Sequence, residues 1–268
     1  MSDDSLTIQS LDWHSITQGV CQRVNQILKQ ADRSGRLKTD GSWVTDTDLA
    51  IQRQLQNWLA ELHPGIGFLG EEMTPQAQQD TLKAGRPLWV LDPLDGTSNF
   101  RAGLPAYATA LALMDQGRVV FGLVHDPCRR ETFTAVRGEG AWLNGGPLTI
   151  HPADVPELSR AVAAVDFKRL PRPLAIKLAT EPPYASQRSI GSVALEWCWV
   201  AAGRFAVYVH GKQNLWDYAA GQLILTEAGG HHITLQGQAP AALDLEPRSA
   251  VCAMSRELLD AWGQALQV

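Results

Sequence analysis

The sequence predicts a mixed fold in which an α+β part is followed by an α/β part, with the boundary near residues 150–160. Three observations predict it: helical patterns near the N-terminus, a central run of strand-like segments, and helices that alternate with strands in the last third. The chain has 268 residues, of which 45% are hydrophobic and 19% charged, so it can build a core and is not disordered. We therefore expect two parts, residues 1–150 and 151–268.

Two amphipathic helices are expected at the start of the chain. Over residues 11–33, apolar side chains recur at spacings of three and four. A second helix is predicted from about Asp46 to Leu62, because Thr45 is a favourable capping residue and His63-Pro64-Gly65 ends the pattern. The polar, Gln-rich stretch between Met73 and Pro87 is expected to be a surface segment.

The middle of the chain favours antiparallel strands joined by tight turns. Asp115-Gln116-Gly117 and Asn144-Gly145-Gly146 have the composition of such turns. The expected strands are residues 88–91, 107–114, 119–125 and 131–136.

After Ile150 the composition changes: a stretch rich in proline precedes alternating helical and strand-like patterns. Gly229-Gly230 is a typical helix stop. The expected helices are residues 191–202, 217–228 and 255–266, and the expected strands are residues 204–210, 231–235 and 250–253.

Charge and cysteine usage narrow the function classes. A net charge of −5 disfavours a dedicated nucleic-acid binder, which usually carries a basic face. The four cysteines, at positions 21, 128, 198 and 252, have no paired spacing and indicate free thiols in a reducing cytoplasm. No run of about 18 apolar residues predicts a membrane span, and the acidic start does not resemble a signal peptide.

The segment Leu88 to Phe100 carries the strongest chemical signal. A short apolar strand is followed by Asp92 and Asp95, three residues apart on a turn that contains proline. Carboxylates that converge repel each other unless a cation lies between them, and hard oxygen ligands of this kind suit Mg²⁺. Gly96, Thr97 and Ser98 then offer backbone N–H groups at a helix start, which attract anions such as phosphate. The alternative is a plain turn, since all these residue types favour turns.

Three other acidic positions are candidates for the same site. They are Glu71 and Glu72 after a short apolar run, Asp46 and Asp48 at the start of the second helix, and Asp217 at the start of a later helix. Each has a structural alternative: a solvated pair, acids favoured by the helix dipole, and an N-cap. Lys38 is interpreted as a surface lysine, although a role near the metals stays open.

Taken together, these motifs resemble the inositol monophosphatase family of Mg²⁺-dependent, lithium-sensitive phosphatases. The resemblance rests on Gly70-Glu71-Glu72, the segment Asp92–Phe100, Trp216–Gly221 and Glu227–Gly230, in the family's order within Lys38–Gly230. It implies a layered α-β-α-β-α sandwich, two or three bound Mg²⁺ ions, a small phosphorylated substrate and a homodimer.

The resemblance also implies the metal ligands. Glu71 and Asp92 would hold the first ion with the backbone carbonyl of Leu94, and Asp92, Asp95 and Asp217 would hold the second. Glu71 would also reach a third, weaker ion.

The catalytic roles follow from the same resemblance. The Thr97 hydroxyl, paired with Asp48, would orient and deprotonate the attacking water, with Glu71 in support, and Gly96 and Thr97 would donate N–H groups to phosphate. A bound Mg²⁺ lowers the pKa of its water, so no Ser or Cys nucleophile is required. The remaining substrate-binding candidates are Ser98, Gly191, Ser192, His210 and Asp217.

Two departures from the family pattern concern the substrate. His210 stands seven positions before Asp217, where inositol phosphatases usually have an acid, and Val193 stands where a small residue is usual. His210 is either a substrate contact or a strand-end residue, and Lys212 nearby favours a second anionic group.

The expected function is therefore a phosphomonoesterase for a small phosphorylated polyol or sugar. The alternatives are a 3′(2′),5′-bisphosphate nucleotidase, a histidinol-phosphatase, or a regulatory binding protein on the same fold. A haloacid-dehalogenase phosphatase is disfavoured, because Asp46-Thr47-Asp48 leads into a helix and lacks the preceding apolar strand.

Overall fold

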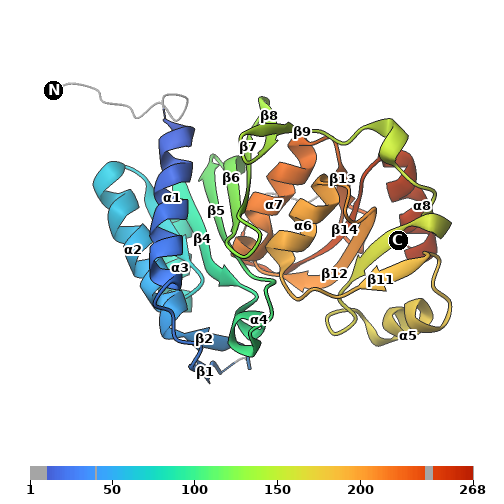
Figure 1. Ribbon diagram of the computed structural model, residues 1–268, viewed down its shortest axis with the longest axis horizontal. Coiled ribbons are helices and arrows are strands. Elements are labelled where there is room, and N and C mark those ends of the chain that lie inside the picture. The colour runs from blue at the N-terminus through green and yellow to red at the C-terminus, as the bar shows by residue number, and fades with distance from the viewer. Residues whose placement is uncertain (1–10, 40, 239–243, 268) are drawn as a thin grey trace.

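The computed structural model describes residues 11–39, 41–238 and 244–267, and it has a layered α-β-α-β-α arrangement (Figure 1). Its α-helices are α1 (Trp13–Leu28), α2 (Asp46–Leu62), α3 (Pro75–Lys83), α4 (Thr97–Ala102), α5 (Arg172–Thr180), α6 (Val193–Ala201), α7 (Leu215–Glu227) and α8 (Arg256–Leu266). Two short 3₁₀ helices, η2 (Pro152–Asp154) and η3 (Leu158–Arg160), follow the first large sheet. The predicted fold class is confirmed.

Two large sheets organise the chain. The first has the order β3-β4-β5-β6-β7-β8-β9, where β3 is parallel to β4 and all later neighbours are antiparallel. Its strands are β3 (Gly67–Gly70), β4 (Leu88–Asp95), β5 (Ala108–Asp115), β6 (Arg118–Asp126), β7 (Glu131–Val136), β8 (Gly140–Leu143) and β9 (Gly146–Leu148).

The second large sheet has the order β11-β10-β12-β14-β13, with β10 parallel to both of its neighbours. Its strands are β10 (Val162–Val165), β11 (Ser186–Arg188), β12 (Val207–Gln213), β13 (His231–Ile233) and β14 (Arg248–Ala253). A small hairpin of β1 (Gly35–Leu37) and β2 (Trp43–Thr45) precedes α2.

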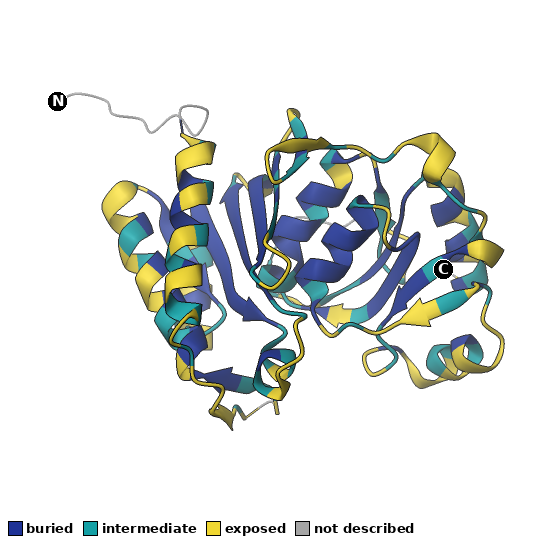
Figure 2. Ribbon diagram, in the orientation of Figure 1, coloured by how far each residue is buried: buried dark blue, intermediate teal, exposed yellow. Residues whose placement is uncertain are grey.

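Helices cover both faces of the first sheet because β4 is apolar on both sides. Trp89 and Leu91 belong to the core beneath α1 and α2, whereas Leu88 and Val90 belong to the core that faces α6 and α7. The alternation follows from the two-residue period of a strand. Nearly all residues of α6 and α7 are buried, as expected for helices that lie between two sheets (Figure 2, dark blue).

Small residues let this middle layer pack closely. A Cβ atom at Gly122 on β6 would lie 2.8 Å from the Ala220 carbonyl oxygen of α7. A Cβ atom at Gly221 would lie 2.6 Å from the Trp197 Cβ atom of α6. The Ala219-Ala220-Gly221 run in α7 therefore has a packing reason, since larger side chains would push the helix off the sheet.

Most predicted elements are present, with shifted ends. The second helix has the predicted bounds, and the four central strands lie within one residue of their predicted starts. The first helix ends at Leu28, five residues before the predicted end, and the strand predicted to end at Leu91 continues to Asp95. No helix in the described part of the chain is long and apolar enough to cross a membrane.

Several elements were missed. The Gln-rich stretch contains α3, which Thr74 caps by accepting the Ala77 N–H at 3.3 Å. The proline-rich stretch contains β10, α5 and β11. Proline does not prevent α5 because Pro171 and Pro173 stand at its start, where proline is tolerated. Each large sheet comes from one side of residue 150, whereas the core between the sheets is continuous, so a division into two parts stays a prediction.

Candidate active site

A bulge at the end of β4 brings the two central carboxylates to one side of the sheet. Asp92 pairs with Ala110 and Asp95 pairs with Ala108, so β4 uses one more residue than β5 over this interval. In a regular strand, side chains three apart point to opposite faces; the extra residue cancels that alternation. Pro93 is at the bulge, where it has no N–H to offer the ladder, and its carbonyl accepts the Thr109 hydroxyl at 2.8 Å.

The turn after β4 is fixed by a glycine and an asparagine. Gly96 has φ 89°, and a Cβ atom there would lie 2.9 Å from the Ala106 carbonyl oxygen. Asn99 donates its side-chain amide to the carbonyl oxygens of Ala106 at 2.7 Å and Ile190 at 2.8 Å. The turn therefore leads directly into α4, whose first N–H groups have no earlier helical carbonyl to bond. Thr97 is half-buried here and Ser98 is exposed.

Asp48 joins α2 to this turn. Its Oδ2 atom accepts the Thr45 N–H at 2.8 Å and also the Thr45 hydroxyl, which completes a capping box at the start of α2. Its Oδ1 atom lies 3.1 Å from the Thr97 hydroxyl, which also lies 3.0 Å from the Leu94 carbonyl oxygen. Burial raises the pKa of Asp48, and the hydrogen bonds from Thr45 and Thr97 oppose that shift. The structure thus brings Asp48 and Thr97 into contact, as the sequence analysis expected of this pair.

Glu71 and Glu72 reach the site from the end of β3, which lies parallel to β4. The Lys38 ammonium donates to Glu71 at 2.8 Å and to Glu72 at 2.6 Å. Burial, together with the charge of Glu71, raises the pKa of Glu72 to about 7, while Lys38 opposes the rise. Lys38 is half-buried rather than a solvated surface side chain, so that interpretation of the sequence was wrong.

Asp217 and Asp95 anchor the site to the two middle helices. Asp217 accepts the Asn214 N–H at 2.8 Å and closes a capping box at the start of α7. Asp95 accepts the Ser192 hydroxyl at 2.5 Å and the Ala194 N–H at 2.8 Å, both at the start of α6. The Ser192 hydroxyl is therefore fully buried against Asp95, whereas Gly191 beside it is exposed.

The ionised carboxylates of the site repel one another. Burial raises the pKa of Asp92 well above its usual range, and the charges of Glu71, Asp95, Asp217 and Asp48 add to the shift. Burial raises the pKa of Asp95 to about 6 although Ser192 and Ala194 donate to it. Carboxylates in this arrangement favour a cation or bound protons.

Hydrogen bonds from protein donors hold these acids in place. Asp92 accepts the Leu94 N–H at 3.0 Å, and the other acids accept the protein donors given above. Among the residues that the structure describes, no group of three acidic, His or Cys side chains lies in a metal-binding arrangement.

His210 lies in the middle of β12 and is buried. Its Nε2 atom lies 3.1 Å from Asp166 Oδ2, and its Nδ1 atom accepts the Lys212 N–H at 3.1 Å. A ring that accepts at Nδ1 carries its proton on Nε2, so a neutral His210 donates to Asp166. Both ring nitrogens are thus occupied by protein atoms, and a direct substrate contact requires one of these bonds to break.

Glu196 was not singled out from the sequence. It is buried in α6, where its Oε1 atom accepts the Ile190 N–H at 2.9 Å beneath Gly191, and burial raises its pKa to about 8. The available signal was an acid inside the apolar run Ala194–Ala201.

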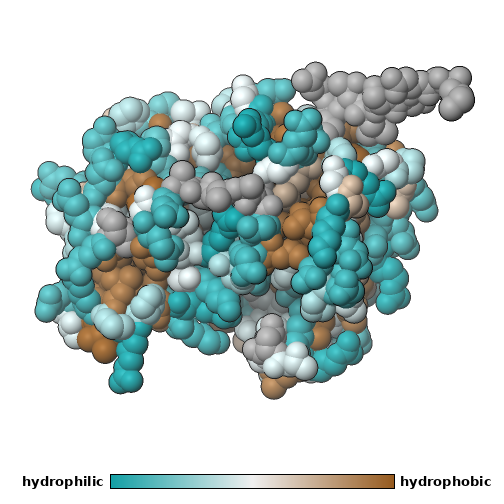
Figure 3. All heavy atoms as spheres, turned by 180° about the vertical axis from the view of Figure 1, so that it is seen from behind, coloured by the Kyte–Doolittle hydropathy of each residue, from teal (hydrophilic) through white to brown (hydrophobic). Residues whose placement is uncertain are grey.

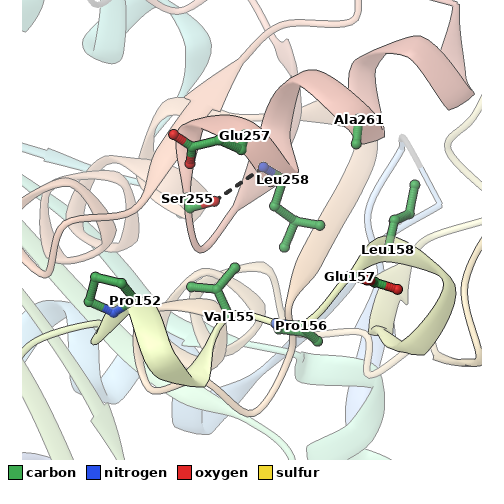
Figure 4. A pocket seen from close by; sticks show the side chains of 9 residues that line it. All are labelled: Pro152, Val155, Pro156, Glu157, Leu158, Ser255, Glu257, Leu258 and Ala261. Carbon is green, nitrogen blue, oxygen red and sulfur yellow. Dashed lines mark hydrogen bonds between the residues drawn. The ribbon is translucent and has the colours of Figure 1, made fainter.

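A pocket of about 460 Å³ lies away from these acids, between the 3₁₀ helices and the start of α8 (Figure 4). Its walls are mainly apolar, with Glu157 and Glu257 among the lining residues, and Ser255 caps α8 by accepting the Leu258 N–H at 3.1 Å. None of its lining residues is a predicted site residue.

The face of the molecule opposite to the one in Figure 1 is mostly hydrophilic, with separate apolar patches (Figure 3).

The chain matches the inositol monophosphatase family over residues 9–267. It belongs to that family. The inositol-1-monophosphatase of Mycobacterium bovis is 42% identical over 206 residues, which cover 74% of this chain and 70% of that protein. The Nus factor SuhB of Pasteurella multocida is 35% identical over 207 residues, 75% of each chain.

Solved structures of the family share the fold. The inositol monophosphatase II of Staphylococcus aureus with bound inositol monophosphate superposes with a TM-score of 0.78 at 26% identity. The match covers 94% of this chain and 90% of that one.

Proposed function

We propose that this protein is a Mg²⁺-dependent phosphomonoesterase that hydrolyses a small phosphorylated polyol or sugar. The observation that supports the proposal is the contact between Asp48 and Thr97, a carboxylate and a hydroxyl close to the strand end that carries Asp92 and Asp95. The inositol phosphatases among the family relatives support the same class of reaction.

The candidate metal ligands are of the chemical type that Mg²⁺ prefers. Glu71, Asp92, Asp95 and Asp217 offer hard carboxylate oxygens, and the Leu94 carbonyl lies between them in the chain. Because burial and mutual repulsion raise the pKa values of Asp92, Asp95 and Asp217, a divalent cation would relieve an existing electrostatic cost. When bound, two or three such ions would supply charge neutralisation for phosphate and a more acidic water.

The protein groups would then do the following. Asp48, through the Thr97 hydroxyl, would hold the attacking water and accept its proton. The N–H groups of Gly96 and Thr97, at the turn into α4, would bind phosphate oxygens. Lys38 would limit the negative charge by pairing with Glu71 and Glu72.

Several finer points belong to the same proposal. We expect lithium sensitivity, a cytoplasmic homodimer, and a 3′(2′),5′-bisphosphate nucleotide or histidinol phosphate as alternative substrates. A regulatory role is the second candidate, because some relatives are described as Nus factor SuhB. The acid set around Asp92 favours catalysis, since binding to a partner would not need it.

The test is phosphate release with and without MgCl₂, and with added LiCl. The panel holds inositol 1-phosphate, histidinol phosphate, fructose 1,6-bisphosphate and adenosine 3′,5′-bisphosphate. We expect Mg²⁺-dependent release that Li⁺ inhibits. Absence of release from folded protein in MgCl₂ would reject the phosphatase and leave the regulatory role.

A further inference from the structure

The loop before α6, residues 190–192, contacts the turn after β4 in two places. The Asn99 side-chain amide donates to the Ile190 carbonyl oxygen at 2.8 Å. The Ser192 hydroxyl donates to Asp95 at 2.5 Å. Because residues 190–192 belong to no helix or strand, their own position depends on further hydrogen bonds.

Glu196, in the first turn of α6, supplies two of those bonds. Its Oε1 atom accepts the Ile190 N–H at 2.9 Å, and its own N–H donates to the Ser192 carbonyl oxygen at 3.0 Å. Only the first bond depends on the side chain, since any residue other than proline offers a backbone N–H. Removal of the carboxyl group would therefore leave the part-buried Ile190 N–H without its acceptor, which costs free energy.

Together these contacts close a ring of bonds that passes through the proposed active site. Within the turn, the Asn99 N–H donates to the Gly96 carbonyl oxygen at 2.9 Å, and Gly96 is covalently joined to Asp95. In order, the ring contains Glu196, Ile190, Asn99, Gly96, Asp95 and Ser192. A change at Glu196 can therefore act on Asp95 and Gly96 through the loop.

The surroundings of Glu196 give packing no reason for a carboxyl group at this position. The residue is 1% exposed, and the other residues of Ala194–Ala201 are apolar and buried. A buried carboxyl group costs free energy unless polar partners compensate for the lost water, and an apolar side chain would fill the helix without that cost. The bond to the Ile190 N–H accounts for the carboxyl group.

We propose that Glu196 is a positioning residue: by holding the loop before α6, it keeps Asp95 and the Gly96 turn in place for phosphate hydrolysis. This inference rests on the proposed phosphatase function and adds a residue that acts through the loop rather than by contact with the substrate. Displacement of a reacting group by about 1 Å can reduce a rate about 10²-fold, so a shift of the loop is expected to lower kcat.

The experiment compares variants of α6 with the parent protein in saturating MgCl₂, on the panel substrate that the parent hydrolyses fastest. Glu196→Leu removes the acceptor and is expected to lower kcat about 10- to 100-fold. Glu196→Gln keeps an oxygen for the Ile190 N–H and is expected to restore kcat to within about threefold of the parent value. Unfolding temperatures establish that each variant is folded at the assay temperature.

A matched control separates positioning from general stability. Cys198→Ala removes a fully buried thiol from the same helix without touching the loop, and its kcat is expected to stay within about threefold of the parent value. If Glu196→Leu does not fold, Glu196→Ala replaces it, because alanine removes the same acceptor and favours helices.

A double-mutant cycle tests the path through the loop. Asn99→Ala removes the amide that binds the Ile190 carbonyl oxygen. If Glu196 acts through this contact, Glu196→Leu should lower kcat much less in the Asn99→Ala background than in the parent, because the loop is already detached from the turn.

Three results would overturn the inference while the phosphatase proposal stands. They are a kcat of Glu196→Leu equal to that of the parent, equal losses in Glu196→Leu and Cys198→Ala, and fully additive losses in the cycle with Asn99→Ala. Absence of phosphate release from the parent protein across the panel would instead reject the proposed function itself, and this inference with it.

Discussion

The turn at the end of β4 and the surface beside β12 differ in how their charged side chains are held. Around the turn, Asp48, Asp95 and Asp217 each accept hydrogen bonds from backbone N–H groups at helix starts, so their positions are set before any ligand arrives. Beside β12, by contrast, the Arg169 and Lys212 side chains are exposed, and neither forms a hydrogen bond or ion pair with a described residue. The fold therefore fixes the acids of the proposed site but leaves these two cations in solvent.

The largest effect is expected from a substitution among the acids of the proposed site. Asp92→Asn should reduce kcat by about a thousandfold or more, because it removes the carboxylate whose pKa the charges of the other acids raise. The amide has the same shape and its oxygen can still accept the Leu94 N–H, so the unfolding temperature without metal should not fall.

The matching measurement needs no substrate. MgCl₂ should raise the unfolding temperature of the parent protein, since a ligand of the folded state stabilises it, and should do so much less in Asp92→Asn. Near-normal turnover in this variant would contradict the proposed metal site.

The next effect concerns the proton path. Thr97→Val keeps the size of the side chain but removes the hydroxyl that contacts Asp48, and it should lower kcat by about 10²–10⁴-fold. Thr97→Ser retains the hydroxyl and serves as the matched control, with activity expected within about tenfold of the parent. If the two variants were equally active, the hydroxyl would have no role in the reaction.

The sequence allowed prediction of those features that depend on residues close together in the chain. The α2 helix was placed correctly because its capping residues adjoin its apolar stripe, and the acidic motifs pointed to side chains that the structure brings near Asp92. The roles assigned to those residues stay predictions.

Contacts between distant segments were not predictable in this way. The Ser192 bond to Asp95 spans 97 positions and the Lys38 bond to Glu71 spans 33, and neither leaves a local pattern. The β4 bulge was missed for the same reason, because its register depends on β5. The Asp166 partner of His210 lies just after β10, far from His210 in the sequence, so the sequence left two interpretations of that histidine open.

A smaller effect, on stability, is expected from Glu196, which accepts the Ile190 N–H and so supports the loop before α6. Its pKa of about 8 in the folded state lies above the ordinary glutamate value of 4.5, so the folded state keeps this proton to a higher pH than the unfolded state does. Stability therefore falls as pH rises between these two values, by at most about 1.4 kcal/mol per pH unit, and the loss is complete above pH 8.

Glu196→Gln should remove this loss. Chemical denaturation at pH 5 and pH 9 should show that the variant gains stability relative to the parent at the higher pH. The amide oxygen can still accept the Ile190 N–H, which preserves the loop. A constant difference across this range would show that Glu196 does not titrate there.

The smallest effect on substrate choice is expected at His210. Both of its ring nitrogens bind protein atoms, so His210→Gln should cost about 1 kcal/mol of stability and change the ratio of kcat/KM values for inositol 1-phosphate and fructose 1,6-bisphosphate by less than about threefold. His210→Glu is a stronger probe, because it would place a second carboxylate against Asp166. A selective rise of kcat/KM for inositol 1-phosphate in His210→Glu would show instead that the side chain at this position contacts the substrate.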